Sequence, residues 1–310
     1  PMFNRATDGT YAPGSTFKLC TSVAALESGI ITPSTKILDK GAYTYYPGTP
    51  PKCWIYRQHG TTHGLVNVSE AIKVSCNYFF YEVGRLTGIK TLDDYATQFG
   101  LGQYTGIEIG GPNSAEAKGA LASPEYAEAN DLEWSDGQTL TAAIGQSYNL
   151  FTPLQLANLA AIVANRGYYY IPHIVKKIEG QDSLDRRFYE RHYTKVDPKH
   201  FEPIVEGMWR GVNVGGTSTA ARLEGLDVCG KTGTAENPRG RDHSTFLSFA
   251  PKDNPKIAIS VYVENGGFGA SAALPIASLL EEYYLTDTIR RPALLEHIKN
   301  MNIYYPSYDR

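Results

Sequence analysis

The pattern of apolar residues changes along this chain of 310 residues, and that change is what most constrains its fold. Before Gly225 the predicted elements are mainly helices. After it, three short runs punctuated by Gly, Pro and Asn are typical of strands, at 226–229, 244–249 and 257–263, and a last helix is predicted over 274–284. Helices in the middle of the chain and strands in one late run predict an α/β or α+β fold in which a helical region is inserted beside a sheet.

Most of the predicted helices begin at capping residues. The clearest start is Thr152–Gln155, with Thr as the N-cap, Pro at the first helical position and Gln closing a capping box. Another helix is predicted from Ser15 to Glu27, ending at Gly29. Further helices are predicted to start near Ser69, at Asn77 as N-cap, at Thr91 and at Asp197. Residues 32–68 are rich in turn residues and show little periodicity.

Length and composition fit one globular catalytic domain. Because no linker between domains is evident, we predict a single domain over 1–310, with a helical lobe at roughly 30–150 and a sheet lobe mainly from 1–29 and 168–285. A net charge of −3 without a basic cluster argues against a nucleic-acid partner. The sequence has neither 18 consecutive apolar residues nor a leader at its start, so we expect no transmembrane helix or signal peptide within it.

Three short motifs carry chemistry, and their order and spacing make them informative together. Ser15–Lys18 is a Ser-x-x-Lys at the start of a predicted helix, and Ser75–Asn77 is a Ser-x-Asn sixty residues later. Lys231–Thr234 is a Lys-Thr-Gly followed by Thr, on the first late strand. Each motif alone is weak, because such tripeptides and tetrapeptides occur by chance on solvated faces. Together they predict a serine acyl-transfer site.

The residue types explain how such a site would work. A serine hydroxyl needs a base within hydrogen-bond reach, and Lys18 lies one helical turn after Ser15. Burial beside a second cation, for which Lys231 is the candidate, would lower the pKa of the Lys18 amine. The helix start at Ser15 would also place a backbone N–H and the positive end of the helix dipole beside the reacting carbonyl.

The remaining motif residues have expected roles around the substrate. Ser75 would relay a proton to the leaving group, and Asn77 would hold an acyl or peptide group. Thr232 belongs to the strand motif, Gly233 would let the backbone approach the substrate closely, and Thr234 would supply a second oxyanion N–H. An extended peptide would lie antiparallel to this strand edge.

With these motifs the sequence resembles the transpeptidase domain of class B penicillin-binding proteins, for which the motif triplet is characteristic. The resemblance extends to Tyr11–Ser15, to Gly145–Ser147 followed by Thr152–Ala157, and to His63-Gly64 before Val66–Val68. The last segment favours elongation-type and sporulation-type members over division-type ones. The resemblance implies the penicillin-binding transpeptidase and serine β-lactamase-like fold, an antiparallel sheet flanked by helices with an inserted, mostly helical lobe.

The resemblance also implies an activity and a setting. Ser15 would attack the D-Ala–D-Ala carbonyl of a peptidoglycan stem peptide and pass the acyl group to an amine of a neighbouring stem, and β-lactams would acylate the same serine. Family members typically carry an N-terminal anchor and a pedestal domain, and we expect neither within this sequence. They act at the extracytoplasmic face of the bacterial cell membrane, and the implied partner is a glycosyltransferase of the elongation or sporulation machinery.

Four cysteines raise the question of a disulfide or a metal: Cys20, Cys53, Cys76 and Cys229. Cys53 and Cys76 fall in the same irregular region as Asp39, His59 and His63, and thiolate, imidazole and carboxylate are suitable zinc ligands. The spacing matches no standard zinc finger, so a Cys53–Cys76 disulfide stays open, as does His59 in place of His63. Cys20 and Cys229 are expected to be buried as small apolar side chains.

The resemblance favours the metal. Some elongation-type and clostridial members bind zinc in this region, and the matching positions here are Asp39, Cys53, His63 and Cys76. A structural zinc ion at Cys76, inside the Ser-x-Asn motif, would hold Ser75 and Asn77 in place.

Two other functions share the first motif. A serine β-lactamase needs a base that deacylates the enzyme quickly, and the downstream candidates Glu108, Glu116 and Glu125 stand in no recognisable motif. A β-lactam sensor would be acylated without turnover. A catalytically inactive scaffold is disfavoured because every motif residue is intact.

Overall fold

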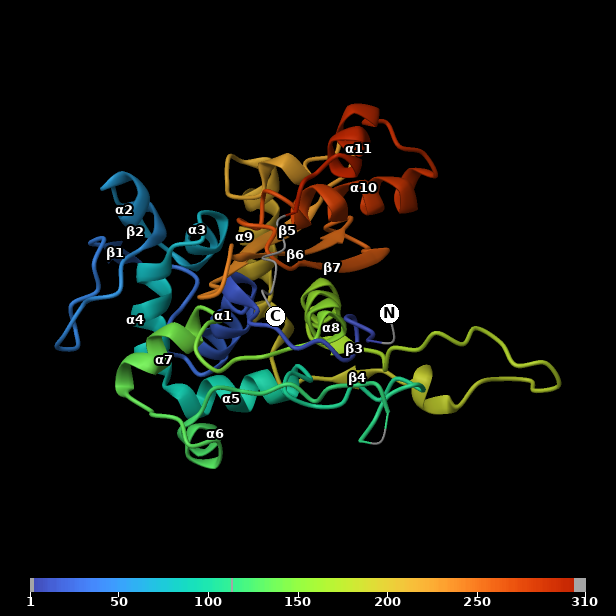
Figure 1. The fold of residues 1–310 in the computed structure, drawn as a ribbon, viewed down its shortest axis with the longest axis horizontal. Helices are drawn as coiled ribbons and strands as arrows, with labels where there is room; N and C mark the ends of the chain where they lie inside the picture. Colours follow the sequence, from blue (N-terminus) through green and yellow to red (C-terminus); the bar gives the residue numbers. More distant parts are fainter. Residues whose placement is uncertain (1–2, 113, 304–310) are drawn as a thin grey trace, which may run out of the picture.

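The computed structural model describes residues 3–112 and 114–303 and shows a three-stranded antiparallel sheet with helices on both sides (Figure 1). The sheet has the order β5-β6-β7, with β5 at Cys229–Ala235, β6 at His243–Ala250 and β7 at Ile257–Val263. Helix α8 (Pro153–Ala164) and helix α10 (Ala273–Thr286) both pack against β6 and β7, and Figure 1 shows them on opposite sides of β7. The predicted sheet flanked by helices is confirmed.

The first strand begins later than its predicted range of 226–229. Strand β5 contains the whole Lys-Thr-Gly motif, and Lys231 pairs with Leu247 in the neighbouring strand. Two glycines, Gly230 and Gly233, interrupt the apolar pattern by which a strand is recognised. Both are needed for close packing, since a Cβ on either would lie 2.5 Å from an atom of β6, in Phe246 or Thr245.

Most of the other helices lie to the left of the sheet or below it in Figure 1. Before the sheet, the chain forms α1 (Lys18–Glu27), α2 (Trp54–His59), α3 (Val68–Lys73), α4 (Asn77–Thr87), α5 (Ile89–Gln98), α6 (Pro124–Ala129), α7 (Asp136–Ala143) and α9 (Glu202–Asn213). Helix α1 is buried from Lys18 to Leu26 and contacts α4 and α5. The nucleophile segment is therefore held in the core rather than on the surface.

Short strands and turns complete the chain. Strands β1 (Ile37–Asp39) and β2 (Gly64–Val66) pair antiparallel, as do β3 (Tyr168–Tyr169) and β4 (His192–Tyr193). Helix α11 (Pro292–Lys299) follows α10. The tyrosines of the chain end, including Tyr304 and Tyr305, lie outside the described residues. None of the described helices is long and apolar enough to cross a membrane.

Several predicted helix boundaries need correction. Cys76, not Asn77, is the N-cap of α4, and its sulfur accepts from the Phe79 N–H. Helix α5 begins at Ile89 rather than Thr91. The helix predicted from Asp197 is divided into a 3-10 turn and α9, which starts at Glu202. The capping box of α8 at Thr152 is confirmed, with both of its reciprocal hydrogen bonds present.

Candidate active site

The predicted nucleophile lies in a tight turn at the start of α1. Ser15 belongs to a 3-10 turn, Gly14–Thr16, directly before the helix. Gly14 has a φ of 55°, and a Cβ there would lie 2.5 Å from the Thr234 carbonyl oxygen of β5. Its N–H donates to the Gly145 carbonyl at 2.9 Å. Only glycine fits this position of the turn. Gly14 and its hydrogen bond to Gly145 therefore place Ser15 close to β5.

The Ser-x-Asn motif lies in the bend between α3 and α4. Ser75 has a φ of 54°, in the left-handed region that a serine rarely adopts. The bend is fixed by backbone hydrogen bonds from Ser75 N to Ile72 O at 3.2 Å and from Cys76 N to Ala71 O at 2.9 Å. Strained residues held in this way are concentrated at functional sites.

Two buried lysines converge on Ser75. Lys18 Nζ lies 3.2 Å from Ser75 Oγ and donates to Asn77 Oδ1 at 2.6 Å. Lys231 Nζ, from β5, donates to the same Ser75 Oγ at 2.9 Å. The structure thus joins all three sequence motifs at one point. Among the described residues, no hydrogen bond connects Lys18 with Ser15, and the direct base contact expected from the helical spacing is absent from this conformation.

Burial controls the charge of these two lysines. It lowers the pKa of Lys18 to about 8. It also holds the pKa of Lys231 well below its usual range, and the nearby Lys18 ammonium lowers it further. The predicted influence of a second cation is therefore felt by Lys231 and not by Lys18, whose pKa is lowered by burial alone. The site keeps an amine close to its neutral, proton-accepting form.

Strand β5 supplies one wall of the site. The Thr232 hydroxyl donates to Thr217 Oγ1 at 3.0 Å, and Gln146 Nε2 donates to the Thr234 carbonyl at 3.0 Å. Gly233 was predicted to allow close approach of a substrate. The structure gives a nearer reason, since a Cβ there would lie 2.9 Å from the Pro13 carbonyl of the nucleophile turn.

These elements enclose a groove of about 410 Å³. Its lining includes the predicted Ser15, Ser75, Asn77 and Thr232–Thr234, and also Trp54, Arg57, Gln146, Thr217, Glu236, Asp242 and Phe268. Of the second group, only Gln146 stood in a segment that the sequence singled out. The others come from loops and a short helix without a local sequence signal.

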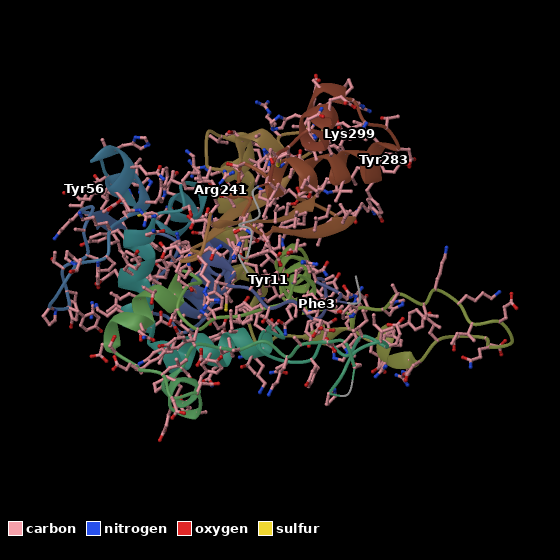
Figure 2. The ribbon with its side chains drawn as sticks, viewed as in Figure 1. Phe3, Tyr11, Tyr56, Arg241, Tyr283 and Lys299 are labelled. Carbon is pink, nitrogen blue, oxygen red and sulfur yellow. The ribbon has the colours of Figure 1, made fainter. Side chains whose placement is uncertain are left out.

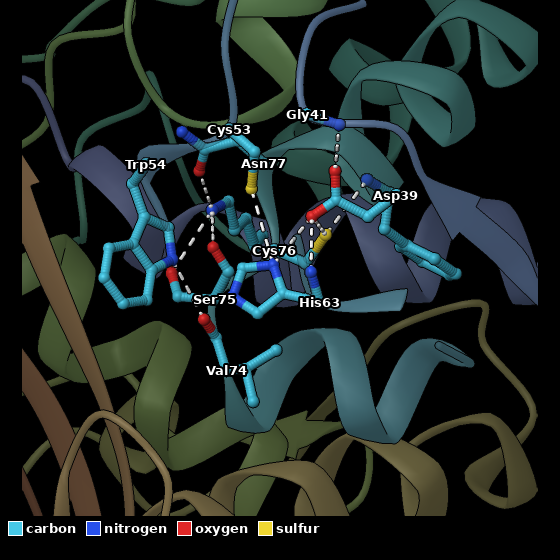
Figure 3. Close-up of polar contacts among 11 residues, drawn as sticks. Asp39, Gly41, Cys53, Trp54, His63, Val74, Ser75, Cys76 and Asn77 are labelled. Atoms are coloured by element: carbon cyan, nitrogen blue, oxygen red, sulfur yellow. Dashed lines mark hydrogen bonds and ion pairs between the residues drawn. The ribbon is translucent and has the colours of Figure 1, made fainter. Parts of the chain in front are cut away.

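Behind the Ser-x-Asn motif, Asp39, Cys53, His63 and Cys76 form one cluster, with their ligand atoms within 4.8 Å of one another (Figure 3). His63 Nδ1 lies 2.9 Å from Asp39 Oδ2 and 3.5 Å from Cys53 Sγ. Cys76 Sγ lies 3.5 Å from the same Asp39 oxygen. The described cysteines are all free thiols, which argues against the disulfide alternative, and His59 is not part of the cluster.

The surroundings of the cluster favour the anionic forms of Cys53 and Asp39 but not that of Cys76. The neighbouring Cys76 and His63 side chains lower the pKa of Cys53, although burial opposes this shift. Burial and the neighbouring Cys53 raise the pKa of Cys76. For Asp39, burial would raise the pKa, but the backbone N–H groups of His63 and Gly41 bring it below its usual value. The ionisation of the two thiols is thus linked, and Cys53 is the one favoured as a thiolate.

The other two cysteines lie apart from this cluster. Cys20 in α1 and Cys229 in β5 are both fully buried. Burial raises the pKa of each thiol, so both stay protonated. They are buried in the core, as predicted.

Comparison with known proteins agrees with this geometry. Residues 1–280 match the family model of the penicillin binding protein transpeptidase domain. The chain is 32% identical to peptidoglycan D,D-transpeptidase MrdA of Acinetobacter baumannii, over 94% of this chain and 45% of that protein. It superposes on Pseudomonas aeruginosa PBP2 in complex with WCK 5153 with a TM-score of 0.81 and 33% identity, covering 93% of this chain and 61% of that one.

A second similar structure is that of a chain described under the structural coordination of polymerization and crosslinking by a peptidoglycan synthase complex. It has a TM-score of 0.78 and 32% identity, and covers 92% of this chain and 48% of the matched chain. The chain therefore belongs to the penicillin-binding protein transpeptidase family. Its relatives are class B members of the elongation type. It spans about half the length of the curated relatives it matches.

Proposed function

We propose that the chain is the catalytic part of a peptidoglycan D,D-transpeptidase. The observation that carries this proposal is the meeting of Lys18 and Lys231 on Ser75 Oγ, beside the groove that Ser15 lines. A hydroxyl nucleophile, an amine of lowered pKa and a second hydroxyl that can relay a proton are the groups that serine acyl transfer requires.

The proposed reaction has two halves. In the first, Ser15 Oγ attacks the carbonyl of the penultimate D-Ala, and its proton passes to the neutral Lys18 amine. The D-Ala–D-Ala amide bond then breaks, and Ser75 delivers a proton to the leaving D-Ala amine while its own is replaced through the lysines bonded to it. In the second half, an acceptor amine attacks the Ser15 ester, loses a proton along the same route, and Ser15 recovers its hydroxyl.

The negative charge on the carbonyl oxygen needs backbone donors. We assign the Ser15 N–H, at the start of α1, and the Thr234 N–H of β5 to this role. The contact of Gly14 with the Thr234 carbonyl region supports the assignment, because it brings the two segments together. Asn77, held by Lys18, would bind the peptide amide of the donor.

Crosslinking itself tests the proposal. A donor peptide ending in D-Ala–D-Ala is incubated with the protein and an amine acceptor, and the products are followed by mass spectrometry. We expect release of D-Ala and a joined product, both lost in Ser15→Ala. If Ser15→Ala retained the release of D-Ala, the assignment of the nucleophile would be wrong.

The structure gives a reason to prefer transpeptidation over β-lactamase activity. The three downstream glutamates weighed as deacylating bases do not line the groove. Glu116 accepts from the Thr105 and Gly111 N–H groups, and Glu108 accepts from those at Ile174 and Val175. The Glu108 and Glu116 carboxylates thus bind backbone N–H groups, and none of the three glutamates lines the groove from which water at Ser15 would be activated.

We further propose that Asp39, Cys53, His63 and Cys76 hold a structural zinc ion. Two sulfurs, one nitrogen and one oxygen make a closed tetrahedral donor set, and their approach to within 4.8 Å fits such a site. His63 would bind through Nδ1, the nitrogen that faces Asp39 and Cys53. Because Cys76 lies between Ser75 and Asn77, the metal would hold both motif residues in position.

Metal content is the direct test of this site. The purified protein should contain about one zinc per chain by elemental mass spectrometry, by analogy with closed structural sites. Cys76→Ser should lose the metal and lower the melting temperature, whereas Cys20→Ser, at a buried thiol outside the cluster, should keep the metal. Full zinc content in Cys76→Ser would remove Cys76 from the ligand set.

The setting follows from the substrate. Peptidoglycan is assembled outside the cytoplasmic membrane, so we propose that this domain acts at the extracytoplasmic face of the bacterial membrane. A glycosyltransferase of the elongation machinery is the proposed partner. The similarity to a chain from a peptidoglycan synthase complex supports this pairing.

A further inference from the structure

One ion pair lies at the mouth of the groove, and the reaction proposed above does not use it. Arg57 Nη1, from α2, lies 3.4 Å from Glu236 Oε1, which directly follows β5. Both side chains line the groove that also contains Ser15 and Ser75. The pair joins two walls that are 179 residues apart in sequence.

The short helix α2 is fixed so that Arg57 faces this groove. Its first residue, Trp54, donates its indole N–H to the Val74 carbonyl at 3.0 Å, next to Ser75 (Figure 3). Cys53, the residue before it, belongs to the Asp39 cluster. Figure 2 labels Tyr56 on this helix, and its ring occupies the space where a side chain at Gly41 would lie. These contacts hold in place the short helix that carries Arg57.

Glu236 continues the row of β5 side chains along the groove. Thr232, Thr234 and Glu236 are spaced two apart, the period at which side chains on an extended chain share a face. All three line the groove. A peptide lying along β5 past Thr234 therefore reaches Glu236 and Arg57 next.

The pair is open to a ligand. Its side chains are 59% and 64% exposed, and a single exposed contact of this kind contributes little to stability. Asp242, the other acidic residue of the groove lining, accepts from the Asn237 N–H. Arg57 and Glu236 are thus the opposite charges that can separate and be replaced by those of a ligand.

We propose that Arg57 and Glu236 form a subsite for a zwitterionic group of the stem peptide, a carbon that bears both an ammonium and a carboxylate. Arg57 would bind the carboxylate through its planar fork of donors, and Glu236 would bind the ammonium. An amine without the adjacent carboxylate would leave Arg57 unpaired. This inference rests on the proposed function, because it takes the stem peptide to be what lies along β5.

Three synthetic pentapeptides ending in D-Ala–D-Ala test the subsite. They differ only in the third residue, which is meso-diaminopimelate with a free carboxylate, the same residue as its carboxamide, or lysine. The measured quantity is how strongly each peptide slows penicillin acylation of Ser15, which gives its dissociation constant. We expect the zwitterionic peptide to bind about tenfold more tightly than the other two, as for a charged hydrogen bond.

Variants assign that preference to the two residues. Arg57→Ala should bring the ratio of dissociation constants, which expresses the preference for the zwitterionic peptide, close to one. Arg57→Lys should restore part of this preference. Glu236→Gln should weaken binding of the peptides that carry the ammonium. Lys90→Ala, at an exposed lysine of α5 paired with Asp94, is the control and should keep the wild-type ratio.

The outcomes separate the two proposals. The subsite would be overturned if the wild type bound the three peptides equally, or if none of them slowed penicillin acylation. It would also be overturned if Arg57→Ala kept the wild-type preference for the zwitterionic peptide. Absence of any penicillin adduct in the wild type would instead contradict the proposed function, and the subsite would then be measured by calorimetric titration of the same peptides.

Discussion

At the scale of single residues, the chemistry depends on the surroundings of two lysines. Lys18 and Lys231 are buried, and both reach Ser75 Oγ. Burial disfavours the ammonium form of each lysine, and the Lys18 ammonium disfavours that of Lys231 further. Burial lowers the pKa of Lys18 to about 8, so that a fraction of the protein holds a neutral amine at neutral pH.

This titration predicts the pH dependence of acylation. In the proposed reaction only the neutral Lys18 amine can accept the proton of Ser15, and its fraction grows as pH rises through a pKa of about 8. The second-order rate constant for penicillin acylation should therefore increase from pH 6 to about 8.5 and then level off. The profile is measured by intact mass at fixed times. A rate that falls over this range would argue against Lys18 as the base.

The nucleophile turn predicts a second effect. Gly14→Ala adds a Cβ 2.5 Å from the Thr234 oxygen at a residue with positive φ, so it should displace Ser15 and slow acylation at least tenfold. It should also lower the free energy of unfolding by about 2 kcal/mol.

Gly29→Ala is the matched control, because Gly29 has a φ of 72° with nothing within 4 Å of the added Cβ. It should show only the backbone penalty, about 1 kcal/mol in urea unfolding, and normal acylation. Equal acylation rates in the two variants would show that the close contact with β5 does not position Ser15.

At the scale of elements, the sequence was informative where local patterns decide the structure. The capping box of α8 was predicted from four consecutive residues. The strands β6 and β7 were predicted from short runs of residues bounded by Gly, Pro and Asn. Helix α2 was missed because it buries no residue of its own and so shows no apolar period. Arg57 and Glu236 could not be paired from sequence, since their contact depends on how α2 meets β5.

The α8 capping box gives a prediction at this scale. Thr152→Ala removes the acceptor for the Gln155 N–H and should lower the free energy of unfolding by about 1 kcal/mol. Ser135 occupies the same N-cap position in α7 but makes no side-chain capping bond, so Ser135→Ala should change stability much less. Urea unfolding of both variants measures the difference. Equal losses would contradict the role assigned to the capping box.

At the scale of the whole molecule, three distant segments meet at one groove. The start of α1 brings Ser15, the bend before α4 brings Ser75, and β5 brings Lys231. The motif spacing predicted that these residues would come together. It could not give the left-handed φ of Ser75, which depends on the bend between α3 and α4.

Intact-protein mass during incubation with a penicillin tests the central claim most directly. We predict one adduct per chain that persists for many minutes after the free drug is removed and is absent in Ser15→Ala. An adduct that disappears as the drug is hydrolysed would instead indicate a β-lactamase. An adduct that forms equally in Ser15→Ala would contradict the account.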